Sequence, residues 1–510
     1  MPRIVVLGGG IAGLAAAHAL ARAGEGAASV PLEVVVVEAA PRLGGKIATE
    51  RAEGFLIEAG ADSFSTRRPD ALELVEELGL AGELLPTGGG RVLVLRDGRL
   101  EELPGALHLV VPTDLGEILR SRLLSAPAKA RMALELLRWP RWGSGRRDAR
   151  SGGGAAAAAG GALRSAGEAP DQAAGPFLRR HFGAEYLERV AGPLLAGIHA
   201  TDPELLSLAA AFPGLAATAR RHGSLIRAAR GRGGSGGPTR VSLAGGVGSL
   251  IDALVQRLEA AGVEIATGRA VVGLQAAVAE PAAGGAIDSS EPAVGALGPD
   301  GTRRGAAGFL LTLAGGASLA ADAVVLAAPP AVTGSLLEPL APGAAAALGA
   351  IPTASTATVS LGFRRQDVRH PLDALGLLVP AREGRALGAC TFASSKFPGR
   401  APAGAVLVRA YLGAGPDAEL PSAPEALAEL ALAELGDLLG LAGPPLLTRV
   451  HRFGAANPQY RVGHRERIAA VEAALPPNLA LAGCAYHGLG IPDCIASGRR
   501  AAERILSETS

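Results

Sequence analysis

The stretch RIVVLGGGIAG, residues 3–13, decides the fold that the rest of the chain has to complete. It opens with a short run of mainly β-branched apolar residues, which predicts a strand buried on both faces. Glycines at positions 8, 10 and 13 then give the spacing G-x-G-x-x-G, and the helix-forming segment LAAAHALARAG follows. Gly8 would permit a sharp turn, Gly10 would let a pyrophosphate approach the backbone, and Gly13 would let helix and strand pack closely. The free N–H groups and positive dipole end of the helix would hold the phosphates.

The glycine spacing needs its context, because 72 of the 510 residues are glycine. A second apolar strand, VVVVE, follows the helix and ends in Glu38. A carboxylate at that position can accept hydrogen bonds from both ribose hydroxyls of an adenosine. The pattern therefore predicts a dinucleotide site, and the alternative is a βαβ turn that binds nothing.

Composition limits the classes of protein that fit. A chain of 510 residues predicts two or three domains, and its 48% hydrophobic content can supply a large core. The net charge of +1 does not point to a nucleic-acid partner. Three cysteines without a C-x-x-C spacing fit a reduced, cytoplasmic protein and predict neither a metal site nor a disulfide framework. We find neither a signal peptide nor an apolar run long enough to span a membrane.

The order of elements predicts an α/β fold with an α+β insertion. A Rossmann-type nucleotide-binding domain would be assembled from discontinuous segments, interrupted by a mixed-sheet substrate domain and a helical insertion domain. Segment 308–330 predicts one strand and then a second that returns the chain to the nucleotide domain. The predicted nucleotide-binding segments are 1–90, 241–330 and 451–510, the substrate-binding and helical insertion region is 91–240, and the mixed-sheet substrate domain is 331–450. Glycine- and alanine-rich composition predicts flexible insertions at 143–175 and 277–305.

The closing segment 478–506 favours a flavin over NAD. It reads as an apolar strand, a glycine loop and a C-terminal helix, with the motif A-G-x-x-x-x-G-x-G-I-x-D-x-I-x-S-G. An NAD dehydrogenase has no need of such an element. Gly488 and Gly490 could bring backbone N–H groups to an isoalloxazine edge, and the helix would direct its positive end at the reduced ring. Asp493 is a candidate ribityl or helix-capping partner.

With these stretches in place, the chain resembles the flavin-dependent porphyrinogen oxidases of haem biosynthesis, within the monoamine-oxidase and phytoene-desaturase superfamily. The resemblance covers essentially the whole chain outside three loose insertions, 143–175, 230–240 and about 277–305. It is closer to the bacterial coproporphyrinogen III type than to the mitochondrial protoporphyrinogen IX type. The matching stretches are VVLGGGIAGLAAAH, VEAAPRLGGKI, EAGADSF, PLLAGIHATDPELLSLAAAFP, SSKFPGRAP, NPQYRVGH and GLGIPDCIASG.

The resemblance implies noncovalent FAD and assigns residues to it. The fingerprint would hold the pyrophosphate, Glu38 with Ala39 the adenosine ribose, and Val271 the adenine through its backbone. The remaining residues would line the flavin. The implied cofactor residues are Gly8, Gly9, Gly10, Ile11, Ala12, Gly13, Glu38, Ala39, Arg42, Lys46, Gly60, Ala61, Asp62, Ser63, Val271, Phe453, Leu489, Gly490 and Ile491.

The resemblance also implies the reaction. It would be the oxygen-dependent oxidation of coproporphyrinogen III to coproporphyrin III, by hydride abstraction to FAD with release of hydrogen peroxide. No side chain would act as a catalytic group. Gly197 would offer a carbonyl to pyrrole N–H groups, and Leu372 and Phe392 would sandwich the tetrapyrrole.

Several alternatives stay open. Protoporphyrinogen IX is the alternative substrate, followed by an amine or carotenoid substrate and by a nucleotide-binding protein without activity. Arg67, Arg68 and Arg91 are candidates to pair with propionates, and His199 is either structural or a substrate contact. Peripheral contact with a membrane at its cytoplasmic face and hand-over of the product to a chelatase are open as well.

Overall fold

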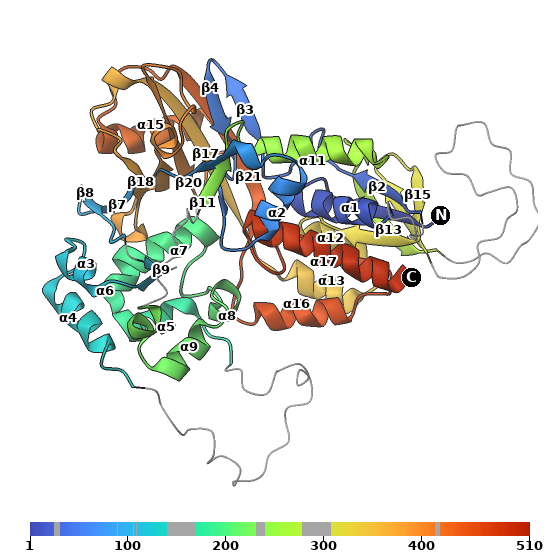
Figure 1. The fold of residues 1–510 in the computed structure, drawn as a ribbon, viewed down its shortest axis with the longest axis horizontal. Helices are drawn as coiled ribbons and strands as arrows, with labels where there is room; N and C mark the ends of the chain where they lie inside the picture. Colours follow the sequence, from blue (N-terminus) through green and yellow to red (C-terminus); the bar gives the residue numbers. More distant parts are fainter. Residues whose placement is uncertain are drawn as a thin grey trace, which may run out of the picture.

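The computed structural model describes residues 1–24, 31–88, 90–105, 107–108, 110–139, 170–230, 240–277, 308–413 and 419–509. Figure 1 shows three regions: a parallel-sheet region that carries both termini, a region built on long strands, and a helical region below it. The mixed α/β architecture predicted from the sequence is confirmed.

The parallel sheet collects strands from distant parts of the chain, in the order β12-β2-β1-β16-β22. Its alternate side chains are buried on opposite faces, as the apolar run at residues 3–7 predicts. Ile4 and Val6 belong to the core on one face, whereas Val5 and Leu7 belong to the core on the other. The strands are β1 (Arg3–Leu7), β2 (Glu33–Val37), β12 (Glu264–Ala266), β16 (Ala323–Leu326) and β22 (Leu479–Leu481).

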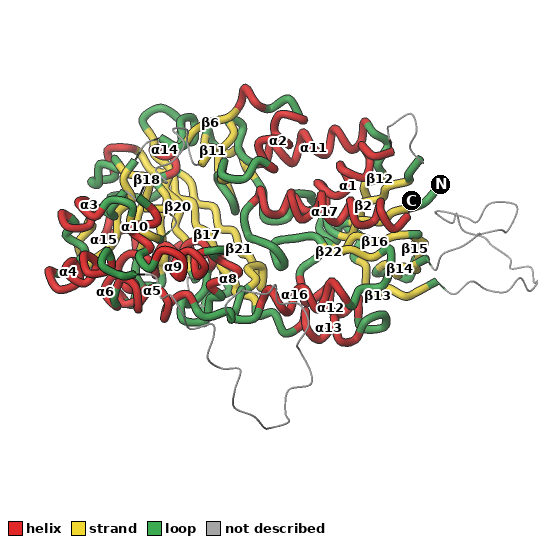
Figure 2. The backbone as a smooth tube through the Cα atoms, turned by 60° about the horizontal axis from the view of Figure 1, so that its bottom comes forward, coloured by secondary structure: helices red, strands yellow, loops and turns green. Residues whose placement is uncertain are grey.

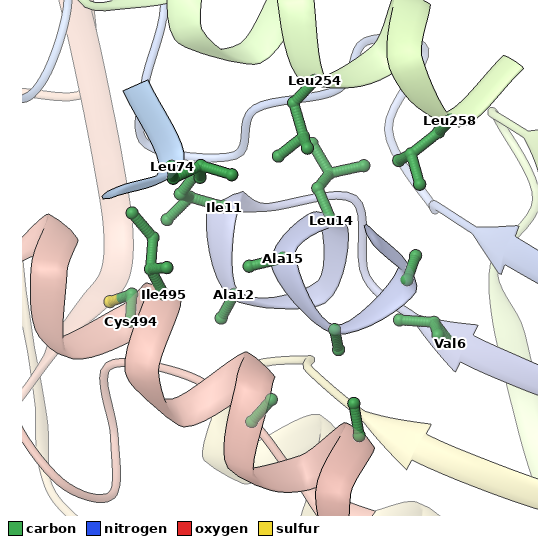
Figure 3. Packing of buried hydrophobic residues seen from close by; sticks show 14 of the residues in the cluster. Val6, Ile11, Ala12, Leu14, Ala15, Leu74, Leu254, Leu258, Cys494 and Ile495 are labelled. Carbon is green, nitrogen blue, oxygen red and sulfur yellow. The ribbon is translucent and has the colours of Figure 1, made fainter. Parts of the chain in front are cut away.

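Helices cover both faces of this sheet. On the first face, α1 packs between α11 and α17 (Figure 3). The contact between α1 and α17 is so close that a Cβ on Gly498 would lie 2.2 Å from the carbonyl oxygen of Ala12. The helices around the sheet are α1 (Ile11–Gly24), α2 (Asp70–Glu77), α11 (Gly248–Ala260), α12 (Pro330–Leu337), α13 (Pro342–Gly349), α16 (His464–Ala473) and α17 (Ile491–Thr509).

Small antiparallel sheets accompany this region. They are the hairpin β3 (Thr49–Ala52) and β4 (Phe55–Glu58), the sheet of β5 (Phe64–Ser65), β11 (Arg240–Leu243) and β6 (Leu84–Pro86), and the sheet of β13 (Val271–Ala276), β14 (Phe309–Leu313) and β15 (Ser318–Ala321).

A seven-stranded mixed sheet forms the second region, in the order β21-β17-β20-β19-β18-β7-β8. Figure 2 shows its long strands running toward the parallel sheet. All neighbours pair antiparallel except β18 with β7. Its elements are β7 (Arg91–Arg96), β8 (Arg99–Glu102), β17 (Thr353–Arg364), β18 (Ala374–Leu378), β19 (Leu387–Thr391), β20 (Ala405–Leu412), β21 (Leu447–Pro458), α14 (Ala393–Lys396) and the covering helix α15 (Pro424–Leu439).

The helical region has its own apolar core and contacts the seven-stranded sheet through α7. It comprises β9 (Leu107–His108), β10 (Val111–Pro112), α3 (Leu115–Arg120), α4 (Ala126–Glu135), α5 (Ala174–Phe182), α6 (Ala184–Tyr186), the π-turn η2 (Leu187–Ala191), α7 (Gly192–His199), α8 (Leu208–Ala211), α9 (Leu215–His222) and α10 (Leu225–Ala229). Short 3₁₀ turns elsewhere are η1 (Ala81–Glu83), η3 (Arg365–Asp367) and η4 (Ala381–Glu383).

The structure corrects some expectations about elements. The second strand predicted within 308–330 is two strands: β15 pairs with β14, whereas β16 joins the parallel sheet. The break falls at Asp322, whose carboxylate and N–H both bond the backbone of Arg3. The predicted boundary between residues 450 and 451 falls inside β21, which pairs with β17 along its length.

The predicted loose insertions fall mainly outside the described residues, at 143–169, 231–239 and 278–305. The end of the first insertion, 170–175, is ordered, contrary to the prediction. There the Asp171 carboxylate accepts hydrogen bonds from Ser207 Oγ at 2.6 Å and from the N–H of Gly463 at 2.9 Å. Helix α5 then begins at Ala174.

Candidate functional site

The fingerprint turn follows β1 and has the geometry that its glycines predict. Gly8 has a φ of +112°, and a Cβ there would lie 2.6 Å from the carbonyl oxygen of Ala327. A Cβ on Gly13 would lie 1.9 Å from the carbonyl oxygen of Gly8. At Gly10, by contrast, a Cβ would meet nothing within 4 Å. Gly8 and Gly13 are therefore required by packing, whereas Gly10 leaves a space at the start of α1 that fits a pyrophosphate.

Ile11, Ala12 and Gly13 form the first turn of α1. The N–H groups of a first turn have no intrahelical acceptors, so they are available to an anion. Ile11 and Ala12 are otherwise buried against α17.

A second glycine loop, residues 42–46, closes over the fingerprint. The N–H of Gly44 donates to the carbonyl of Gly9 at 2.8 Å, and Gly10 and Gly44 form an isolated β-bridge. The guanidinium of Arg42 is directed into its own loop, so it shapes this loop from within. It donates to the carbonyl oxygens of Leu43, Gly45 and Ile47.

Glu38 is fixed beside the fingerprint at the end of β2. Its carboxylate accepts hydrogen bonds from the N–H of Gly9 at 2.6 Å and of Ala40 at 2.8 Å. Each carboxylate oxygen keeps a further lone pair, so both can still accept a ribose hydroxyl. Ala39 next to it is exposed. The N–H of Arg269 donates to the Glu38 carbonyl, which brings the start of β13, and with it Val271, to the same side.

Lys46, the last residue of the 42–46 loop, contacts the other segments of the candidate site. Its carbonyl oxygen lies 2.0 Å from where a Cβ of Gly60 would stand, and Phe453 Cζ lies 3.4 Å from the same point. The Lys46 ammonium donates to the Ala456 carbonyl at 3.0 Å and to Cys484 Sγ at 3.2 Å. Residues from four separated segments thus meet here.

Asp62, in the predicted flavin turn, lies in a buried ion cluster. Its carboxylate pairs with Lys396 Nζ at 2.8 Å and with an Arg409 Nη at 3.0 Å, and it accepts a hydrogen bond from Ser63 Oγ. Burial opposes ionisation, but Lys396 and Arg409 outweigh it and hold the pKa of Asp62 well below its usual range. Arg409 also donates to the Gly60 carbonyl at 2.9 Å, so the cluster fixes the 60–63 turn.

Sequence reasoning missed Lys396 and Arg409 as parts of the site. Lys396 lies in the SSKFPGRAP stretch, and its rarity as a lysine in this chain is a signal that could have drawn attention to it. Arg409 lies in the middle of β20, where its charge is out of place on a buried strand, and that is a second usable signal.

The closing glycine loop precedes α17. Gly488 has a φ of +140°, and a Cβ there would lie 2.5 Å from Asp493 Cγ. Asp493 accepts a hydrogen bond from the N–H of Gly490 at 3.1 Å and pairs with Arg68 at 2.6 Å. As the third residue of α17, Asp493 therefore caps the helix start in the manner of a capping box. Ile491 begins α17 as a buried residue, and Leu489 packs against the core of the helical region.

Tyr460 ties this loop to β22 and was also missed. Its hydroxyl donates to the Cys484 carbonyl at 2.6 Å and accepts the N–H of Gly488 at 2.9 Å. The ring stacks on His464 with centroids 4.0 Å apart. The hydrogen bonds hold the loop on the strand end from which it departs.

The predicted substrate-binding residues lie in α7 and in the core of the seven-stranded sheet. Gly197 is exposed on α7, and a Cβ there would lie 3.7 Å from Leu378. Leu372 and Phe392 belong to the core of the seven-stranded sheet and expose 3% and 0% of their surface. Their contact with a tetrapyrrole therefore stays a prediction. A cavity of about 320 Å³ beside α9 and α10 is lined by none of these residues.

The candidate propionate-binding arginines are either paired or exposed, and His199 is partly buried. Arg68 is engaged by Asp493, and Arg91 pairs with Asp373 and Glu102. Arg67 has an exposed side chain. Burial lowers the pKa of His199 to about 4, so this histidine is neutral near pH 7.

The chain matches the family of flavin containing amine oxidoreductases over residues 11–506. It belongs to this family. The oxidoreductase therefore uses a flavin, and the glycine cradle, Glu38 and the closing loop are the parts of its structure that fit one.

Similar curated proteins indicate the group within this family to which the chain belongs. The oxidoreductase is 36% identical to the coproporphyrinogen III oxidase of Propionibacterium freudenreichii subsp. freudenreichii, over 99% of this chain and 90% of that protein. It is 30% identical to the coproporphyrinogen III oxidase of Bacillus subtilis (strain 168), over 99% and 98%. It is likewise 30% identical to the protoporphyrinogen oxidase of Bos taurus, over 99% and 98%. Within the family the chain thus belongs with the porphyrinogen oxidases, as the resemblance in its sequence implies.

Solved structures agree on the fold. A crystal structure from Exiguobacterium sp. 255-15 has a TM-score of 0.78 and 30% identity, over 99% of both chains. Putrescine oxidase has a TM-score of 0.61 at 16% identity, over 99% of both chains, which shows the fold alone. In the part of the chain that the structure describes, no helix is long and apolar enough to cross a membrane.

Proposed function

We propose that this oxidoreductase converts coproporphyrinogen III to coproporphyrin III in haem b biosynthesis, with molecular oxygen as acceptor and hydrogen peroxide as product. The observation that carries the proposal is the full-length similarity to coproporphyrinogen III oxidases at 36% and 30% identity. Protoporphyrinogen IX is the second candidate substrate, because a protoporphyrinogen oxidase is similar over 99% of the chain as well.

The cofactor in this proposal is noncovalent FAD. A flavin bound in such a site supplies the hydride acceptor, so the protein has to position the substrate and exclude water. The Gly10 space and the first turn of α1 support a pyrophosphate, and Glu38 supports an adenosine ribose, which FMN lacks. Cys484, which follows β22, has its sulfur beside the Lys46 ammonium.

The test compares the two porphyrinogens directly. Oxygen consumption and porphyrin fluorescence are followed with coproporphyrinogen III and with protoporphyrinogen IX at equal concentrations. The proposal expects faster turnover of coproporphyrinogen III and recovery of one peroxide for each oxygen consumed. If neither substrate becomes fluorescent faster than it oxidises spontaneously, the proposal fails. A protein precipitate that stays yellow after acid treatment would rule out noncovalent binding.

Glu38→Ala tests the cofactor assignment. Loss of the carboxylate removes the acceptor for the ribose hydroxyls, and we expect FAD to bind about tenfold or more weakly, as one charged hydrogen bond would give. Equilibrium dialysis with FAD and FMN measures both affinities, and FMN binding should be unaffected. Equal FAD affinity in the variant would contradict the ribose role.

Contact with a membrane is a further part of the proposal. Leu134, Leu137 and Trp139 expose 61%, 67% and 78% of their surface in and just after α4, next to the cationic Arg131 and Arg138. Apolar side chains flanked by cations suit the surface of an anionic bilayer. Sedimentation with anionic and neutral vesicles tests this, and equal binding to both would speak against it. Hand-over of the product to a chelatase and a cytoplasmic location complete the proposal.

A further inference from the structure

Two of the three cysteines lie together at the candidate flavin site. Cys484 follows β22 at the carboxyl edge of the parallel sheet, and Cys494 lies in the first turn of α17. The two thiols hydrogen-bond each other, and both are free. Figure 3 shows Cys494 next to Ile495 on α17, close to the start of α1. A strand end and a helix start bring the pair together, although nine residues lie between them in the sequence.

A lysine is directed at one member of the pair. The ammonium of Lys46 lies 3.2 Å from Cys484 Sγ, and its other acceptor, the Ala456 carbonyl, is neutral. The hydrogen bond from Cys494 and the charge of Lys46 outweigh burial and lower the pKa of Cys484 below that of an ordinary thiol. The same hydrogen bond, together with burial, raises the pKa of Cys494. The carboxylate of Asp493 also raises the pKa of Cys494.

The third cysteine, Cys390, is buried in the core of the seven-stranded sheet. Cys390 lies in β19, exposes 2% of its surface and donates a hydrogen bond to the Thr391 carbonyl, and burial of its thiol outweighs the opposing charge of Arg409. Burial raises its pKa to about 12. It is therefore an internal reference for an unreactive thiol.

We propose that Cys484 and Cys494 form a peroxide-sensitive thiol pair, with Cys484 as the nucleophile held by Lys46 and Cys494 as the resolving thiol. The Cys484 thiolate attacks hydrogen peroxide, an S–O bond forms, the O–O bond breaks, and hydroxide leaves. Cys494 then attacks the sulfenic acid, an S–S bond forms, and water leaves with the Cys494 proton. The two sulfurs lose two electrons in total, and peroxide gains them.

The oxidation would act on the cofactor site. It removes the thiolate that faces Lys46 and links the end of β22 to the first turn of α17, so we expect flavin retention to fall. An oxidase that makes peroxide would produce the oxidant next to this pair. The thiol chemistry itself depends only on the cysteines and Lys46, so added peroxide tests it whether or not the proposed substrate is correct.

The experiment exposes the flavin-loaded protein to hydrogen peroxide and counts thiols after denaturation. We expect the count to fall from three to one, a mass loss of about 2 Da, and a disulfide joining the peptides of Cys484 and Cys494. Cys390→Ala should still form the disulfide, whereas Cys494→Ser should stop at a sulfenic acid that dimedone captures on Cys484. Three intact thiols in the wild-type protein, or loss of Cys390 at the same rate, would overturn the proposal.

Lys46→Met tests the positioning role of the lysine. Alkylation of Cys484 by iodoacetamide is followed against pH in the wild type and in the variant. We expect the midpoint to rise in the variant and the rate near neutral pH to fall about tenfold, because the thiolate loses its counter-charge. A midpoint that does not move would show that Lys46 only fills space.

Discussion

At the scale of single residues, Gly10 and Gly13 of the fingerprint are needed for different physical reasons. Gly13 is required because a side chain would collide with the Gly8 carbonyl, whereas Gly10 borders open space. We therefore predict that Gly13→Ala does not fold stably, and that Gly10→Ala folds with an unchanged melting temperature as apoprotein but loses flavin. Circular dichroism and flavin absorbance separate the two outcomes. A Gly10→Ala protein that keeps its flavin would contradict the cradle.

Asp62 carries a buried charge whose removal should destabilise the fold. In Asp62→Asn, Lys396 and Arg409 lose their buried partner, and we expect a loss of about 3–5 kcal/mol at pH 7. The folded pKa is lowered, so the stabilisation is present above the unfolded pKa of about 3.9 and declines as pH falls below it. Urea unfolding at several pH values should show the two proteins converging at low pH. Asp373→Asn, in a half-exposed ion pair, is the control and should change stability by less than about 1 kcal/mol.

At the scale of elements, the end of α7 contains a strained residue. Ala200 caps this helix in the left-handed region, with φ of +48°. Glycine reaches that conformation without a Cβ penalty, so Ala200→Gly should stabilise the protein by about 0.5–1 kcal/mol. Ala196→Gly, one turn earlier inside the helix, should destabilise it by about 1 kcal/mol. Denaturant midpoints measure both, and a shift of the same sign in both variants would contradict the explanation.

Elements also show where sequence patterns stop being informative. The hairpin β7–β8 is predictable, because Asp97 and Gly98 supply the two positive φ values of its turn. Strand β21 has no apolar alternation to reveal it, since it is held by its pairing with β17. The same holds for the change of sheet at Asp322, which depends on a contact with the first strand.

At the scale of the whole molecule, the candidate flavin site joins the two ends of the chain. The fingerprint and the start of α17 are packed together, although nearly the entire sequence lies between them. A bound flavin should therefore stabilise the parallel-sheet region, by about 2.7 kcal/mol at a hundred times its Kd. Thermal unfolding at increasing FAD concentrations measures this, and Gly10→Ala should show no shift. A wild-type melting temperature that does not change with FAD concentration would contradict a site formed by both ends of the chain.

The sequence by itself determined the first strand, glycine turn and helix, the place of Glu38 after the second strand, and the closing strand, glycine loop and helix. These are local patterns, in which glycine spacing and apolar periodicity directly specify backbone conformation. The tertiary structure alone decided that Lys396 and Arg409 neutralise Asp62, that Arg68 pairs with Asp493, and that Lys46 faces Cys484, one of a pair of cysteines. These contacts join residues from separate segments, so they exist only once the parallel sheet has assembled, and no spacing along the chain encodes them.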